Sequence, residues 1–153
     1  MSSLILRAAQ DQLPVEHPDF PEIGITISQL SGATGNPETD RRNAVTVANG
    51  PVDFSNPATW TGSVDRCPCG TGTAAKMAAL HAKGELGLGE PFRHEGILGT
   101  VYTGELIREV QVGPYPGVVP TISGQAWITG YSTLVLDPQD PFADGYTVGD
   151  IWA

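Results

Sequence analysis

The residues best suited to chemistry lie together in one short stretch, residues 65–73, which reads DRCPCGTGT. Cys69 stands at or just before the start of a predicted helix. A helix N-terminus lowers the pKa of a thiol beside it, so the sequence predicts a thiolate that is accessible near neutral pH. The backbone N–H groups of the first turn have no partner within the helix and bind anions. Glycines at 70 and 72 let a ligand approach that backbone.

A carboxylate accompanies this thiol. Asp65, four residues before Cys69, is placed to hold an ammonium group beside the same turn. A thiol base, an anion-binding turn and a nearby carboxylate together suit a zwitterion such as an amino acid. The alternative interpretation is structural, because Gly-Thr turns often precede helices and free cysteines are often buried as small apolar residues.

Other uses of these residue types fit the spacing less well. Cys67 and Cys69 are separated by one residue, which is too few for good disulfide geometry and one fewer than in a thioredoxin-type centre. With His81 and His94 they make four zinc-ligand types, but the spacing matches no common zinc pattern, so we expect no metal. A phosphate-binding loop with Gly-Lys-Ser/Thr is absent from the sequence. These two histidines and His17 are expected to be exposed or hydrogen-bonded rather than catalytic.

An alanine-rich segment, residues 72–83, is the clearest predicted helix, and it follows the thiol stretch directly. Thr71 or Thr73 is the candidate cap at its start, and Gly84 ends it. Because small apolar residues lie on nearly every side, we expect this helix to be buried all round.

The remaining elements are short. Residues 3–13 are predicted to form a helix that Ser3 caps and Pro14 ends, with Ile5 and Ala8 on its inner face. Alternating or β-branched residues predict strands punctuated by glycines, at residues 23–27, 44–48, 100–103, 106–112, 117–122, 125–129 and 132–136. One buried helix with many mostly antiparallel strands is an α+β fold.

The composition excludes several classes of function. Eight Lys and Arg against 17 Asp and Glu give a net charge of −9, which argues against nucleic acid or an anionic membrane surface as a partner. No apolar stretch approaches the ~18 residues of a membrane span, and no signal peptide is evident. With two unpaired cysteines, we expect a reducing, cytoplasmic location. A length of 153 residues fits one domain, or half of a larger protein.

Residues 65–74, DRCPCGTGTA, resemble a signature of the proline racemase family, which includes proline racemases, 4-hydroxyproline epimerases and trans-3-hydroxyproline dehydratases. The likeness continues through residues 77–84, 95–100 and 137–142. It implies a half of a diaminopimelate-epimerase-like protein, in which a curled, mostly antiparallel sheet wraps around one buried central helix. The active site of such a protein lies between two halves.

The resemblance also implies a mechanism without a cofactor. Family members invert the α-carbon of proline or hydroxyproline with two cysteines on opposite faces, one removing the proton and the other delivering one. Cys69 matches the second of these cysteines, and Asp65 matches a residue that contacts the substrate nitrogen. The backbone of Gly70 and Thr71 matches the carboxylate cradle.

The opposing cysteine has no counterpart in this chain, so residues 1–153 correspond to the C-terminal domain of a family member. The other cysteine, Cys67, stands where the family more often has serine. We therefore expect little activity from the chain alone, with either the missing N-terminal half or a second copy as its partner, and a tail, residues 137–153, that packs on the missing half. The alternatives are half of a dehydratase, whose members generally have threonine at position 69, and a truncated fragment that folds without catalysis.

Overall fold

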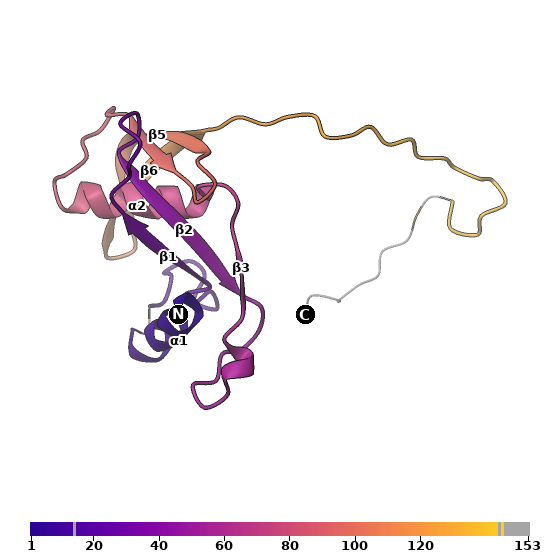
Figure 1. The fold of residues 1–153 in the computed structure, drawn as a ribbon, viewed down its shortest axis with the longest axis horizontal. Coiled ribbons are helices and arrows are strands. Elements are labelled where there is room, and N and C mark those ends of the chain that lie inside the picture. Colours follow the sequence, from indigo (N-terminus) through magenta and orange to yellow (C-terminus); the bar gives the residue numbers. More distant parts are fainter. Residues whose placement is uncertain (14, 144, 146–153) are drawn as a thin grey trace.

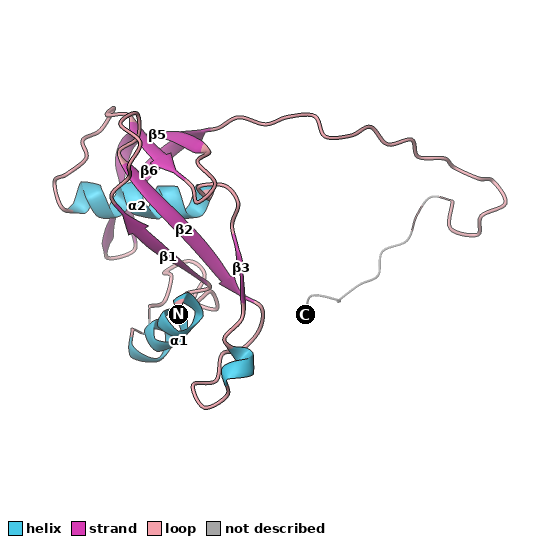
Figure 2. Cartoon of the chain, in the orientation of Figure 1, coloured by secondary structure: helices cyan, strands magenta, loops and turns pink. Residues whose placement is uncertain are grey.

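The computed structural model describes residues 1–13, 15–143 and 145, and within that part it shows an α+β domain built on one mixed sheet. The six strands have the order β1-β2-β4-β5-β6, with β3 paired to β2 (Figure 1). Neighbouring strands are antiparallel except for β2 and β4, which are parallel. The elements are α1 Ser2–Gln12, β1 Ile27–Gly32, β2 Arg41–Ala48, the 3-10 helix η1 Pro57–Thr59, β3 Gly62–Val64, α2 Gly70–Ala82, β4 Phe92–Glu95, β5 Val101–Val112 and β6 Tyr115–Ser123 (Figure 2).

Helix α2 packs on the sheet and forms the core with it. Its buried side chains Met77 and Leu80 meet three others, Leu86, Phe92 and Leu106. Gly104 of β5 permits this close packing, because a Cβ there would lie 2.6 Å from the sulfur of Met77. The far side of α2 is exposed, at Ala75, Ala79 and Ala82. The expectation of a helix buried all round is therefore wrong, because the sheet covers one face only.

Helix α2 begins closer to Cys69 than the sequence predicts. The helix begins at Gly70 rather than 72, and the capping side chain is Cys69 rather than Thr71 or Thr73. Its C-terminal signal is confirmed, since the chain leaves the helix through Gly84 with φ 71°. The thiol is thus part of the helix terminus itself.

Helix α1 forms as predicted, but its orientation differs. Ser3 lies inside the helix rather than at its cap, and its hydroxyl donates to the carbonyl of Trp60 over 3.3 Å. Ser3 and Leu6 are buried, whereas Ile5 of the predicted inner face is 49% exposed, so the face of α1 that packs on β1 and β2 is not the predicted one. The predicted stop at Pro14 falls on a residue outside the described part of the chain.

Three predicted strands are wrong in place or in kind. The first strand begins at Ile27, where the 23–27 prediction ends. Residues 125–129 and 132–136 form no strand and run away from the body of the domain (Figure 1). Their alternating pattern lacks a partner to pair with, and a strand needs one. Tyr131 and Leu134 in this segment are 92% and 94% exposed.

Candidate active site

Cys69 lies at the N-terminus of α2 in a backbone conformation that side-chain-bearing residues rarely adopt. Its φ is 63° and its ψ 123°, and it is the one non-glycine residue of positive φ in the part of the chain described above. The N–H of Gly72 donates to the Cys69 sulfur over 3.3 Å. A conformation of this kind costs about 1–3 kcal/mol and persists only where its surroundings impose it, which is a feature of functional sites.

Buried polar side chains hold the residue before Cys69. The carbonyl of Pro68 accepts hydrogen bonds from Asn43 Nδ2 over 2.7 Å and from Thr73 Oγ1 over 3.2 Å. Thr73 Oγ1 in turn lies 3.0 Å from Nδ1 of His94, which has no exposed surface. The sequence offered Thr73 as a helix cap and His94 as an exposed or hydrogen-bonded histidine, but it did not indicate this network. Only folding brings the three side chains together from β2, α2 and β4.

Asp65 and Cys67 lie in the same turn as Cys69 and contact each other there. The thiol of Cys67 donates to Asp65 Oδ1 over 3.7 Å, and the N–H of Cys69 donates to the Cys67 sulfur over 3.4 Å. Tyr102 of β5 joins this group, since hydrogen bonding to Cys67 is the main cause that raises the pKa of its phenol. The structure therefore brings Asp65 and Cys69 together, and it adds a phenol that the sequence did not point to.

The pKa of the Cys69 thiol is raised above its ordinary value. Burial is the largest cause, and the hydrogen bond and charge of Asp65 act in the same direction, while the N–H of Gly72 lowers it. The expectation that the helix N-terminus produces an accessible thiolate is wrong here, because desolvation outweighs the first-turn hydrogen bond. At neutral pH Cys69 rests as a protonated thiol.

Gly70 and Thr71 occupy the first two positions of α2, where backbone N–H groups have no partner within the helix. Both residues are exposed. Apart from its two chain neighbours and the backbone of α2, no described heavy atom lies within 4 Å of where a Cβ would stand on Gly70, so the turn is open to a ligand. An anion bound to these N–H groups would lie beside Cys69.

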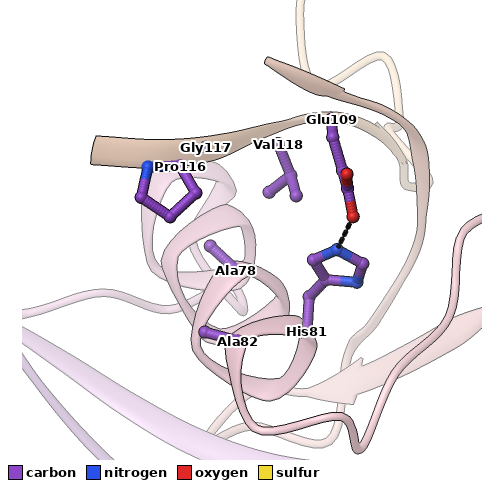
Figure 3. A pocket seen from close by; sticks show the side chains of 7 residues that line it. All are labelled: Ala78, His81, Ala82, Glu109, Pro116, Gly117 and Val118. Carbon is purple, nitrogen blue, oxygen red and sulfur yellow. Dashed lines mark hydrogen bonds and ion pairs between the residues drawn. The ribbon is translucent and has the colours of Figure 1, made fainter. Parts of the chain in front are cut away.

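His81 belongs to a different place on α2. Figure 3 shows a hollow of about 280 Å³ between the C-terminal half of α2 and strands β5 and β6, with His81 at its edge. The Nε2 of His81 lies 2.9 Å from Glu109 Oε1, and its Nδ1 lies 2.9 Å from the Leu86 carbonyl; these two partners raise its pKa. His81 therefore lies apart from Cys67 and Cys69, so the four residues considered for zinc are not brought together. No group of three or more metal-ligating side chains occurs among the described residues.

A strained thiol therefore lies beside a carboxylate and an open helix N-terminus in this α+β domain. A comparison with protein families found a match: the family described as proline racemase matches residues 1–147. The chain therefore belongs to the proline racemase family.

Curated relatives agree with this membership. The proline racemase of Clostridioides difficile is 39% identical over 137 residues, which are 89% of this chain and 37% of that protein. The 4-hydroxyproline epimerase of Brucella ovis is 36% identical over 148 residues, or 96% of this chain and 41% of that protein. The chain therefore spans about two fifths of the length of the curated relatives it matches.

Solved structures of similar fold carry related descriptions. A probable proline racemase from Agrobacterium radiobacter K84, with bound carbonate, has a TM-score of 0.70 and 31% identity over 99% of this chain and 41% of that one. A hydroxyproline epimerase from Agrobacterium vitis, with bound trans-4-hydroxy-L-proline, has a TM-score of 0.67 and 32% identity over 97% and 40%. Among the described residues, no helix has the length and apolar character needed to cross a membrane.

Proposed function

We propose that this chain is the C-terminal catalytic half of a cofactor-independent proline or hydroxyproline racemase or epimerase. The observation that carries the proposal is the strained Cys69 thiol at the start of α2, beside Asp65 and the open first turn. Membership of the proline racemase family supports it. The relative described with bound trans-4-hydroxy-L-proline supports an imino acid as the ligand.

The charges of the site match those of a zwitterion. The substrate carboxylate binds the N–H groups of Gly70 and Thr71, where the helix dipole favours an anion. The substrate nitrogen, which carries a positive charge, binds the carboxylate of Asp65. These two contacts place the α-carbon of the substrate beside the Cys69 sulfur.

Cys69 acts as the proton donor in one direction of the reaction, because its raised pKa keeps the thiol protonated. A thiolate on the opposite face removes the α-proton: the C–H bond breaks, an S–H bond forms, and the electron pair spreads into the substrate carboxylate. The S–H bond of Cys69 then breaks as its proton adds to the α-carbon from the other side. The product is the inverted amino acid, and the two sulfurs have exchanged roles.

The opposing thiolate comes from outside this chain, because Cys67 lies on the same side as Cys69. We propose a diaminopimelate-epimerase-like arrangement, in which a second half or a second copy of the chain faces the site. Of the predicted tail, residues 137–153, we propose that the described residues 137–143 pack on that partner, while residues 144 and 146–153 lie outside the described part of the chain. The exposed apolar side chains of the preceding segment, Tyr131 and Leu134 among them, support such a partner, as does the coverage of two fifths of the relatives' length. The reaction belongs in a reducing compartment, where both thiols stay free.

Protection of Cys69 from alkylation tests the substrate contacts directly. The Cys67→Ser variant leaves one thiol, whose reaction with iodoacetamide is followed by mass spectrometry at increasing ligand concentration. We expect proline and 4-hydroxyproline to slow the reaction in a saturable way. Cyclopentanecarboxylate, which has the ring and carboxylate but no nitrogen, is expected to protect less.

The Asp65→Asn variant is the matched control, because it keeps the shape of the side chain and removes its charge. In this variant proline and cyclopentanecarboxylate are expected to protect Cys69 equally. Equal protection by the two ligands in the Asp65-containing chain, or protection by neither, contradicts the assignment.

A further inference from the structure

We infer that His94 is a positioning residue which, through Thr73 and the carbonyl of Pro68, holds Cys69 in its strained conformation and so sets the direction of the thiol. That this positioning serves catalysis rests on the proposed function. The positioning itself concerns the geometry of the thiol, with or without substrate.

The peptide unit between Pro68 and Cys69 is held at both ends. Its carbonyl accepts from Asn43 and Thr73, and its N–H donates to the sulfur of Cys67. Because a peptide unit is planar, contacts at both ends fix its orientation, and that orientation sets φ of Cys69. The three contacts thus impose the positive φ that Cys69 would otherwise avoid.

The direction of the hydrogen bonds follows from counting protons. The hydroxyl of Thr73 has a single proton, and this proton is donated to the carbonyl of Pro68. Thr73 Oγ1 must then accept from Nδ1–H of His94, which leaves Nε2 of the ring without a proton. Among the described residues Nε2 has no hydrogen-bond partner, and a proton there would be buried without an acceptor. The neutral ring with its proton on Nδ1 is therefore the form that satisfies every donor.

The electrostatics of the ring agree with this assignment. Burial, with a smaller contribution from the charge of Lys76, lowers the pKa of His94 to about 4. The ring is therefore neutral across the physiological range, and its Nδ1–H is always available to Thr73. An aromatic side chain also packs on the ring, as Phe92 lies with its ring centroid 5.1 Å from that of His94.

Strand β4 supports the same turn through its backbone. Gly96 follows the strand and lies against residues 67 and 68, so closely that a Cβ there would stand 2.9 Å from the Pro68 nitrogen. Across the sheet, His94 is paired in register with Tyr102, which contacts Cys67 from β5. The side chain of His94 and the backbone at Gly96 therefore support the turn together, so β4 and the residue after it fix the position of the Cys69 thiol.

Two matched pairs of variants separate the effect of the hydrogen bonds of His94 and Thr73 from the effect of side-chain volume. Asn carries its amide nitrogen at the same place along the side chain as Nδ1, whereas Gln carries it at the place of Nε2, so His94→Asn keeps the donor to Thr73 and His94→Gln does not. Thr73→Ser keeps the hydroxyl and Thr73→Val replaces it with a methyl group. All are made in the full chain with Cys67→Ser, and the alkylation rate of Cys69 by iodoacetamide is measured from pH 6 to pH 10 without substrate.

We expect His94→Gln and Thr73→Val to release Cys69 from its half-buried place beside Asp65. The thiol pKa should fall toward its ordinary value of about 8.5, and alkylation at pH 8 should become severalfold faster. His94→Asn and Thr73→Ser should titrate like the parent. If His94→Gln does not fold, the two Thr73 variants decide the question alone.

Leu106→Val, a core change away from the turn, controls for general loosening of the domain. A shift of the thiol pKa in this control as large as that in His94→Gln or Thr73→Val overturns the inference. Parent-like titration of both Thr73→Val and a folded His94→Gln also overturns it. Because no substrate is present, these outcomes are independent of whether the chain proves to be half of a racemase.

Discussion

Gly72 brings the first turn of α2 into direct contact with the sheet, so Gly72→Ala is a sharp probe of how the thiol is positioned. A Cβ at this position would lie 2.9 Å from Val45 Cγ2, and it would also press on the side-chain oxygen of Gln29. Val45 is 1% exposed and has no room to move. Gln29 is flexible, but its oxygen accepts a hydrogen bond from Asn43 Nδ2 over 2.9 Å, and displacing it breaks that bond.

Three contributions set the size of the effect on the free energy of unfolding. Overpacking against Val45 costs about 1–3 kcal/mol. Loss of the bond between Gln29 and Asn43 costs about 1 kcal/mol. Alanine in place of glycine inside a helix returns about 0.5–1 kcal/mol. The net loss is about 2 kcal/mol, which lowers the urea midpoint by about 1 M for a slope near 2 kcal/mol per M.

Gly70→Ala is the matched control for this measurement. It adds the same methyl group to the same turn, at a position where nothing lies within 4 Å. Urea unfolding followed by circular dichroism should therefore give a midpoint for Gly70→Ala close to that of the parent. If Gly72→Ala is as stable as Gly70→Ala, the account of how α2 is seated on β1 and β2 is refuted.

Three further predictions concern other parts of the domain. The folded pKa of His94, about 4, lies below its unfolded value of 6.5, so stability should fall as the pH drops from 6.5 to 4, by up to about 3 kcal/mol, and the His94→Asn variant should lack this part of the loss. Glu109→Gln should lower the pKa of His81 in an NMR titration, although the Leu86 carbonyl keeps part of the shift; an unchanged pKa refutes the pairing. Leu106→Ala, at a side chain with no exposed surface, should cost about 2–5 kcal/mol in urea unfolding, and a loss below 1 kcal/mol contradicts its place in the core.

Sequence periodicity predicted the parts of the fold that are locally determined. The alanine-rich segment that became α2 carries its pattern within a few turns. The strands predicted at residues 100–103 and 106–112 are one continuous strand, β5, because the chain continues through Gly104 without a turn. Strand β4, Phe92–Glu95, was missed because four residues with two charges and a histidine show no apolar alternation. The opposite error at residues 125–136 arose because alternation alone does not supply a neighbouring strand.

The candidate site divides in the same way. Asp65, Cys69 and the first turn of α2 lie within one short stretch of the chain, residues 65–73, so the sequence alone indicated them as a candidate site. Asn43 and Tyr102 come from β2 and β5, and only the sheet order brings them to the turn. The raised pKa of Cys69 was not predictable either, because burial is a property of the folded domain.

Inversion of proline tests the central claim most directly. We would measure it in a chimera in which this chain replaces the matched segment of the Clostridioides difficile proline racemase, which is 39% identical to it. Chiral chromatography and deuterium incorporation at the α-carbon, both in deuterated water, give the rates of inversion and exchange. The account predicts inversion with uptake of one deuteron by the chimera, a loss on the order of 10²–10⁴-fold or more in Cys69→Ser, and no inversion by the chain as a monomer. Inversion by Cys69→Ser at the rate of its parent would contradict it.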